Sequence, residues 1–271
     1  MTDLPDAGGS RRPRRGRTRA PGRRRASVTG VLGEILITLG VLSLLFVAWQ
    51  LWIGDWIGAA EKNAAGKSIS EQWAREYAAS TPAASTPPAS TPTPTPAATP
   101  GAPVTPVVSP EPADAQIFGV MYVPRFGKDY QVPMAGGVSR PRTLDPIGIG
   151  HYPGAPMPGA IGNVALAAHR TTFGKPFNQI THLHLNDAIV IETAAGWYTY
   201  RFRNLEYVKP TAIDVLLPVP QKPGVKADGR YLTMTSCSPM YFATERIVAY
   251  SVFDSFTPRA DGPPASLKGG T

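Results

Sequence analysis

The run of residues 35–53, ILITLGVLSLLFVAWQLWI, has no charged side chain and constrains the chain more than any other stretch. At about 1.5 Å per helical residue it spans about 28 Å, close to the thickness of a bilayer core. Trp49, Trp52 and Trp56 lie at its far end, where tryptophans favour the membrane interface. We therefore predict an uncleaved transmembrane anchor over residues 28–54. A cleaved signal peptide is the alternative, although its apolar region is usually shorter.

Positive charge is concentrated before this run. Nine of the 27 Lys and Arg residues, but only two of the 19 acidic ones, lie in the first 26 residues, so the remainder is close to neutral. A basic tail, residues 1–27, on this side of the anchor predicts a cytoplasmic N-terminus and an extracellular remainder. Because the charge belongs to one tail and aromatic residues are not interleaved with it, we do not expect nucleic-acid binding.

Two further segments precede the folded domain. Residues 55–79 read as a weakly amphipathic juxtamembrane helix, and residues 80–113 form a Ser/Thr/Pro/Ala tract. Such a tract has too little apolar bulk for a core and favours polyproline II, so we expect a disordered linker. At about 3.1 Å per residue it would hold the following domain up to roughly 100 Å from the membrane. Residues 259–271 read as a disordered tail.

Strand patterns dominate residues 114–258, which are numerous enough for one core. A hairpin is expected over 187–210 with its turn at 194–196, and a second pairing between 231–237 and 245–256. Further strands are expected at 116–127, 130–138 and 163–170, and short helices at 178–183 and 211–216. The pattern predicts a mainly β fold, a closed or nearly closed barrel of seven to eight strands with short helices.

Cys237 is the only cysteine of the chain, and it lies at the end of the expected strand YLTMTSC. In an exported protein an unpaired thiol either forms an intermolecular link or is reactive. A thiol acts as a nucleophile in its thiolate form, and a histidine is the usual partner that favours this form.

The chain has four histidines. His169 ends the apolar run NVALAAH, where a polar residue reaches the rim of a barrel; a hydrogen-bonded rim or core histidine is the alternative. His151 lies in the Gly/Pro-rich stretch GIGHYPGAPMPG. His182 and His184 have no third ligand near them in the sequence, so we interpret them as surface residues.

Arg246 begins the strand that is expected to pair with the Cys237 strand. A hairpin would bring the two residues close together across its arms. A guanidinium there would donate hydrogen bonds to a developing oxyanion or to a bound carbonyl. The alternative is a solvated charge at a sheet edge.

Taken in order, these pieces resemble the sortase family of Gram-positive cell envelopes, and most of all its class E members from actinobacteria. The segment Thr233-Met234-Thr235-Ser236-Cys237, followed nine residues later by Arg246, is similar to the family's TLxTC motif, with Met for Leu and Ser for Thr. Residues 167–177, AAHRTTFGKPF, resemble the AGHR segment. Residues 148–159 resemble the GHYPGT-type loop, with Ala155 in place of the threonine.

The resemblance implies a sortase-type barrel and a cysteine transpeptidase. Because no acidic cluster in the sequence suggests a calcium site, we expect no metal requirement and no cofactor. Cys237 would attack the carbonyl after Thr in an LPxTG-like or LAxTG-like sorting signal of a secreted protein, giving a thioacyl enzyme. His169 would exchange protons with the leaving and incoming amines, and Arg246 would stabilise the oxyanion. The candidate substrate-binding residues are Tyr152, Thr235 and Ser236; Tyr152 would favour alanine at the second position of the signal.

Alternatives remain for the partners and for the activity itself. The resolving amine would belong to a peptidoglycan precursor, or to a pilin lysine if the enzyme polymerises pilins. A non-catalytic, membrane-tethered wall-binding module would need no reactive cysteine. An L,D-transpeptidase is disfavoured because its Ser-His-Gly-Cys motif is missing around Cys237. We expect a single-pass protein of the cell membrane with its catalytic domain outside.

Overall fold

The computed structural model describes residues 27–49, 54–81 and 104–268. The chain forms two compact units, residues 1–47 and residues 48–271. Helix α1, Val28–Ala48, makes up most of the described part of the first unit, and its length and composition would allow it to cross a membrane. Most of the expected basic tail, the end of the expected anchor and most of the Pro-rich tract lie outside the described residues.

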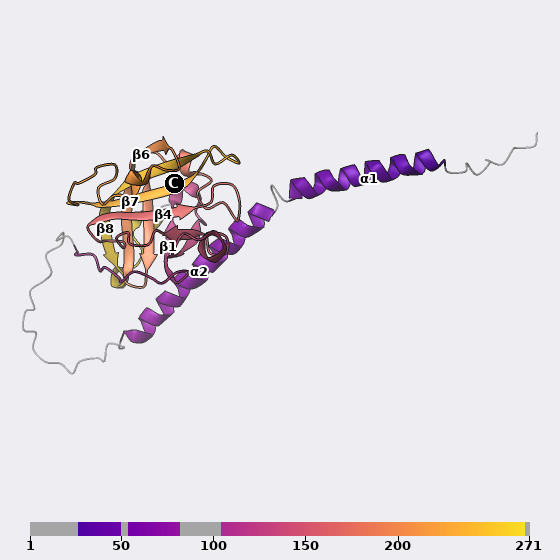
Figure 1. Ribbon diagram of the computed structural model, residues 1–271. Helices are drawn as coiled ribbons and strands as arrows, with labels where there is room; N and C mark the ends of the chain where they lie inside the picture. The colour runs from indigo at the N-terminus through magenta and orange to yellow at the C-terminus, as the bar shows by residue number, and fades with distance from the viewer. Residues whose placement is uncertain (1–26, 50–53, 82–103, 269–271) are drawn as a thin grey trace, which may run out of the picture. The chain divides into compact units, whose positions relative to one another are not determined.

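The second unit is built around a closed barrel of eight strands, as predicted. The strands follow the order β1-β2-β3-β4-β7-β8-β6-β5 around the barrel, and Figure 1 shows β4 and β7 side by side. They are β1 Ile117–Tyr122, β2 Gln131–Gly136, β3 Ile149–His151, β4 Gly162–Ala168, β5 Ala188–Thr193, β6 Gly196–Val208, β7 Arg230–Ser238 and β8 Glu245–Pro258.

Both expected hairpins are present: β5 pairs with β6 and β7 with β8, each antiparallel. Two neighbouring pairs are parallel, β2 with β3 and β4 with β7. Strand β3 was not predicted, because three residues inside a Gly/Pro-rich stretch give too short a pattern. The expected helices are single turns, η4 (Ile180–His182) and η5 (Ile213–Leu216). The remaining short turns are η2 Pro124–Phe126, η3 Arg140–Leu144, η6 Arg259–Asp261 and α3 Ala265–Lys268.

Alternation along the strands separates the barrel core from the outer face. On β7, Leu232 and Met234 are fully buried in the core. Thr235 and Cys237 have the opposite parity and therefore point outward. The same alternation on the other strands fills the barrel with aliphatic, Met and aromatic side chains.

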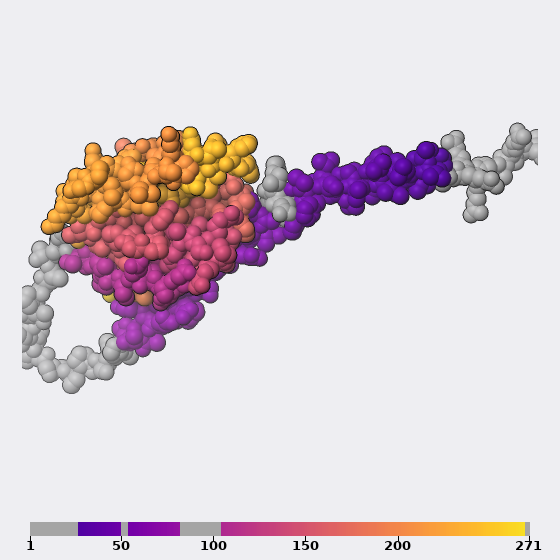
Figure 2. Space-filling model, viewed as in Figure 1, coloured from indigo at the N-terminus to yellow at the C-terminus, as the bar shows by residue number. Residues whose placement is uncertain are grey.

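Helix α2, Gly54–Ser80, packs along β2 and β1 on one side of the barrel (Figure 1). Figure 2 shows α2 in purple on this side, with the chain after residue 200 in orange to yellow on the opposite side. The helix approaches so closely that a Cβ on Gly66 would lie 1.9 Å from the carbonyl oxygen of Gln131. Asn63 also accepts a hydrogen bond from the Gln131 amide at 3.1 Å. Because only glycine permits this approach, α2 docks by shape and polar contacts rather than by an apolar stripe.

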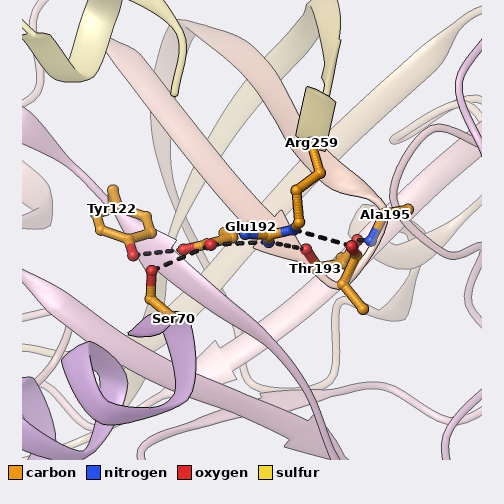
Figure 3. A network of polar contacts seen from close by, with 7 residues as sticks. Ser70, Tyr122, Glu192, Thr193, Ala195 and Arg259 are labelled. Atoms are coloured by element: carbon orange, nitrogen blue, oxygen red, sulfur yellow. Dashed lines mark hydrogen bonds and ion pairs between the residues drawn. The ribbon is translucent and has the colours of Figure 1, made fainter. Parts of the chain in front are cut away.

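A buried polar network joins the second half of α2 to the barrel (Figure 3). At its centre is Glu192 of β5, whose side chain is 0% exposed. Its carboxylate accepts hydrogen bonds from Ser70 of α2 at 3.1 Å and from the Tyr122 hydroxyl at 2.5 Å. The Arg259 guanidinium donates to the same carboxylate at 2.8 Å and to the carbonyls of Thr193 and Ala194. Burial and the neighbouring carboxylate raise the pKa of Tyr122, so this hydroxyl stays protonated as a donor.

The C-terminal segment differs from the expected disordered tail. Residues 259–268 form η6 and α3, and the Arg259 side chain is only 5% exposed. Its guanidinium also lies over the rings of Trp197, 4.6 Å from the centroid, and Trp73 of α2, 5.9 Å away. The prediction failed because the partners of Arg259 lie about 65 residues away on β5, a contact that no local pattern indicates.

The end of the predicted linker also contacts the barrel. Glu111 accepts a hydrogen bond from the Gly154 amide at 2.7 Å, and the Val107 carbonyl accepts one from the Tyr198 hydroxyl. The tract 82–103 therefore connects two segments, α2 and residues 104–113, that both contact the barrel. Its length does not set the distance between the barrel and the residues before α2, which corrects our interpretation of the tract as a spacer.

His151 makes the stability of the barrel sensitive to acid. The ring is 0% exposed, and Nε2 lies 3.1 Å from the Pro156 carbonyl. Burial lowers the pKa of His151 from its usual 6.5, so the unfolded chain binds this proton more readily than the fold does. The stabilisation from neutral His151 is complete above about pH 6.5 and is lost as the pH falls below that value.

We expect the free energy of unfolding, measured in urea at about pH 7.5 and about pH 5.5, to decrease in acid. The decrease should be smaller in His151→Gln than in the wild type. His182→Gln, at an exposed position, serves as the control and should keep the wild-type slope. Equal slopes in all three proteins would contradict the assignment.

Candidate active site

Cys237 and Arg246 lie opposite each other on the β7–β8 hairpin. The antiparallel register pairs them directly, as the sequence pattern predicted. Ile247 and Ala249 of β8 belong to the barrel core, as does Met234 of β7. Cys237 and Arg246 have the opposite parity, so they share the outer face of the barrel wall.

The strand on the other side of β7 brings His169 to the same level. β4 runs parallel to β7, with Ala167 paired to Thr235. Continued by two residues, this register puts His169, just beyond the end of β4, beside Cys237. Neighbouring strands lie about 4.8 Å apart, so His169, Cys237 and Arg246 form one row across three adjacent chain segments. All three residues are partly exposed. This arrangement presents a thiol between an imidazole and a guanidinium.

The polar groups of His169 and Arg246 have other partners in this structure. Nε2 of His169 lies 2.6 Å from Oδ1 of Asp145. The Arg246 guanidinium donates to the carbonyl of Ala243 in the loop between β7 and β8, at 3.0 Å, and to that of Glu245 at the start of β8, at 2.8 Å. The Arg246 guanidinium is therefore bound to backbone carbonyls next to the row.

Arg170 is a second guanidinium beside Cys237, and the sequence analysis did not single it out. It is only 8% exposed, and its Nη1 donates to the Cys237 carbonyl at 3.4 Å. Its Nε is buried and has no hydrogen-bond partner among the residues that the structure describes. No ion pair to Arg170 is present among the described residues, so its guanidinium is an unpaired positive charge next to the backbone of Cys237. In the sequence, its position directly after His169 was the one indication that Arg170 lies near Cys237.

The expected substrate-binding residues are separated by the alternation of β7. The Tyr152 hydroxyl lies 3.0 Å from Oγ1 of Thr235, on the face that Cys237 shares. Ser236 points the other way: it is 4% exposed and donates to the Ala168 carbonyl at 2.7 Å. The structure therefore brings Tyr152 and Thr235 to the row of candidate catalytic residues, but not the hydroxyl of Ser236.

A cavity of about 830 Å³ opens beside His169. It is lined by the first turns of α2, by Asp145, by residues 171–174 and by Tyr241 of the β7–β8 loop. Cys237, His169 and Arg246 do not themselves line it, so it adjoins the row rather than containing it. Within the described residues, no group of three His, Cys, Asp or Glu side chains could hold a metal ion. His182 and His184 are exposed, as expected.

The sequence matches the sortase domain model over residues 121–253. It is 30% identical to sortase SrtE2 of Streptomyces coelicolor over 267 residues, which cover 94% of this chain and 93% of SrtE2. The chain belongs to the sortase family. It is also 34% identical to sortase SrtE1 of the same organism over 262 residues, or 94% of this chain. That alignment covers 65% of SrtE1, so this sortase spans less than two thirds of the length of that relative.

Solved sortase structures share the fold. The SrtA sortase from Actinomyces oris aligns with a TM-score of 0.57 and 30% identity, over 60% of this chain and 93% of that one. Sortase E1 from Streptomyces coelicolor, whose crystal structure holds a tripeptide in the active site, aligns with a TM-score of 0.54 and 35% identity, over 58% of this chain and 99% of that one. The resemblance to class E sortases and the predicted sortase-type barrel are thereby confirmed.

Proposed function

We propose that this sortase is a membrane-anchored cysteine transpeptidase with Cys237 as its nucleophile. The observation that carries the proposal is the row across β4, β7 and β8. The register pairs Cys237 with Arg246, and the Ala167–Thr235 pair leads to His169 beside Cys237. Nucleophile, proton carrier and oxyanion donor are the three groups that acyl transfer requires.

In the first step, the Cys237 thiolate attacks the carbonyl carbon of the Thr residue in the sorting signal, at the bond between Thr and Gly. The carbonyl oxygen becomes an oxyanion, which the Arg246 guanidinium stabilises by hydrogen bonding and charge. When the oxyanion collapses, the peptide C–N bond breaks. The imidazolium of His169 gives its proton to the leaving amine, and the acyl half remains on sulfur as a thioester.

In the second step, a primary amine attacks the thioester carbonyl. His169, now neutral, takes the proton of the attacking amine, and the C–S bond breaks to release the thiolate. The product is a new amide bond, and both side chains return to their starting charges. The acceptor amine belongs to a peptidoglycan precursor, so the reaction joins a secreted protein to the cell wall.

The sorting signal is of the LAxTG or LPxTG type. Tyr152 supports an alanine at the second position, because its hydroxyl is tied to Thr235 on the face that carries Cys237. Helix α1 anchors the protein in the membrane, consistent with its length and apolar composition. The arginines before it keep the N-terminus in the cytoplasm, so the barrel acts outside the cell.

Mass spectrometry of the intact full-length chain in detergent tests this function. Incubated with LAxTG or LPxTG peptides, the protein should gain the mass of the acyl half on Cys237, and the two rates rank the motifs. Arg246→Lys, which keeps the charge but loses the fork of donors, should slow acylation by about 100-fold. A thiol that reacts with an alkylating reagent yet forms no adduct with either peptide would disprove the proposal.

A further inference from the structure

A carboxylate holds the imidazole of His169. Nε2 lies 2.6 Å from Oδ1 of Asp145, and the two side chains are 12% and 23% exposed. Because an ionised carboxylate only accepts hydrogen bonds, Nε2 supplies the proton of this contact. The other ring nitrogen, Nδ1, is then the one left to give and take protons during a reaction.

The backbone around Asp145 is held in turn by helix α2. Asp145 follows the turn η3, and its amide donates to the Arg140 carbonyl at 2.8 Å. Its own carbonyl accepts a hydrogen bond from Nζ of Lys62 at 2.8 Å, and the Pro146 carbonyl accepts one from the same ammonium at 3.1 Å. Lys62 is 7% exposed, and burial lowers its pKa. Because one buried ammonium binds both carbonyls, moving this turn would break two charge-assisted hydrogen bonds, so Lys62 restricts the position of Asp145.

The loop on the other side of the imidazole, residues 171–175, also touches α2. The Phe173 ring lies at a tilt of 32° to the His169 ring, with centroids 5.2 Å apart. A Cβ on Gly58 of α2 would lie 3.2 Å from the amide nitrogen of Gly174. The helix backbone and the loop are therefore in close contact. Both segments that flank the imidazole therefore contact α2, the helix that precedes the barrel in the sequence.

We propose that Asp145 is a positioning residue for His169, and that Lys62 of α2 fixes Asp145 in this place. The inference rests on the proposed function, in which His169 carries the protons of acyl transfer. A carboxylate bound at Nε2 keeps the ring in one tautomer and one orientation, with Nδ1 directed to the reaction. Helix α2 is then part of the support of the catalytic site and not only a connection to the anchor.

The first test separates turnover from binding in the full-length chain. Asp145→Asn keeps the shape of the side chain but removes its charge. We expect kcat for peptide transfer to an amine to fall by about 10- to 100-fold with KM unchanged, the size of effect that misplacement of a reacting group produces. Asp187→Asn is the matched control, because it changes a carboxylate that Arg125 binds at 2.8 Å through both oxygens. It should leave kcat and KM at the wild-type values.

The second test observes the ring itself and needs no peptide. In protein labelled with ¹⁵N-histidine, the His169 resonances are assigned by their loss in His169→Asn. We expect the wild-type neutral ring to carry its proton on Nε2, and Asp145→Asn to shift the nitrogen resonances toward a mixture of both tautomers. Asp187→Asn should leave these resonances in place.

The third test addresses the helix. Lys62→Met removes both hydrogen bonds to the carbonyls, so kcat should fall several-fold, in the same direction as in Asp145→Asn. Ser70→Ala removes a docking contact of the same helix, to Glu192, and should leave kcat and the His169 resonances unchanged. Thermal unfolding identifies any variant that fails to fold. If Lys62→Met fails to fold, kcat and the His169 resonances of Asp145→Asn decide whether the inference holds.

Wild-type kcat in Asp145→Asn would overturn the inference, as would an increase in KM alone or an unchanged tautomer. A wild-type chain that forms no acyl-enzyme would instead refute the proposed function. The nitrogen resonances would then still decide whether Asp145 orients the ring, so the two failures are distinguishable.

Discussion

If the proposed function is correct, replacing Cys237 with alanine is expected to abolish cleavage and transfer of a sorting-signal peptide, a loss of at least about 10⁴-fold in turnover. The reason is chemical: Cys237 is the only cysteine of the chain, and without its sulfur no thioester forms. The side chain is partly exposed on the outer face of β7, so the fold should be unaffected. Chromatography of the released C-terminal peptide measures the loss of turnover. Thermal unfolding shows whether the fold is unaffected.

Two comparisons make this result decisive. Ser238→Ala changes a buried hydroxyl one residue along β7, and should retain activity within about tenfold of the wild type. In cells, Cys237→Ala should prevent attachment of secreted clients to the wall. A non-catalytic wall-binding module would show no difference between Cys237→Ala and the wild type, and that outcome would exclude a transpeptidase.

Replacing Arg259 with alanine is expected to lower the free energy of unfolding by about 3–5 kcal/mol. Arg259 and Glu192 form a pair at 2.8 Å with side chains 5% and 0% exposed. The substitution leaves the Glu192 carboxylate buried without its cation, and it removes the hydrogen bonds of Arg259 to the carbonyls of Thr193 and Ala194. Urea unfolding of the full-length chain followed by circular dichroism measures the change.

Arg201→Ala provides the matched control for this stability prediction. Arg201 and Asp254 also pair, at 3.2 Å, but their side chains are 34% and 42% exposed. Because water solvates both groups, we expect a loss of less than about 1 kcal/mol. Equal losses in Arg201→Ala and Arg259→Ala would show that burial does not distinguish the two ion pairs.

The elements that the sequence predicted correctly are those that depend on local patterns. Alternating residues indicated the β7–β8 hairpin, and the hairpin alone implies that Cys237 and Arg246 lie across from one another. The hairpin turn between β5 and β6 followed from Gly196 between two β-rich arms in the same way. Each of these contacts joins residues near in sequence, where chain geometry leaves few arrangements.

The features that the sequence left out join distant residues. Asp145 and His169 are separated by 24 positions, and Lys62 meets the Asp145 carbonyl across 83. Helix α2 carries no clear apolar stripe, because it docks through glycine and polar contacts, so its pattern gave no sign that it packs on the barrel. The structured segment after Arg259 was missed for the same reason. Partners at such separations could not be predicted from local patterns, because they come together only when the barrel closes.

The docking of α2 has a consequence for the integrity of the protein if its chain is cut. The Pro-rich tract 82–103 is flanked on both sides by segments bound to the barrel. A protease that cut the chain within this tract would not set the enzyme free from its anchor. The two fragments would stay together through the buried contacts of α2, as a nicked but assembled molecule.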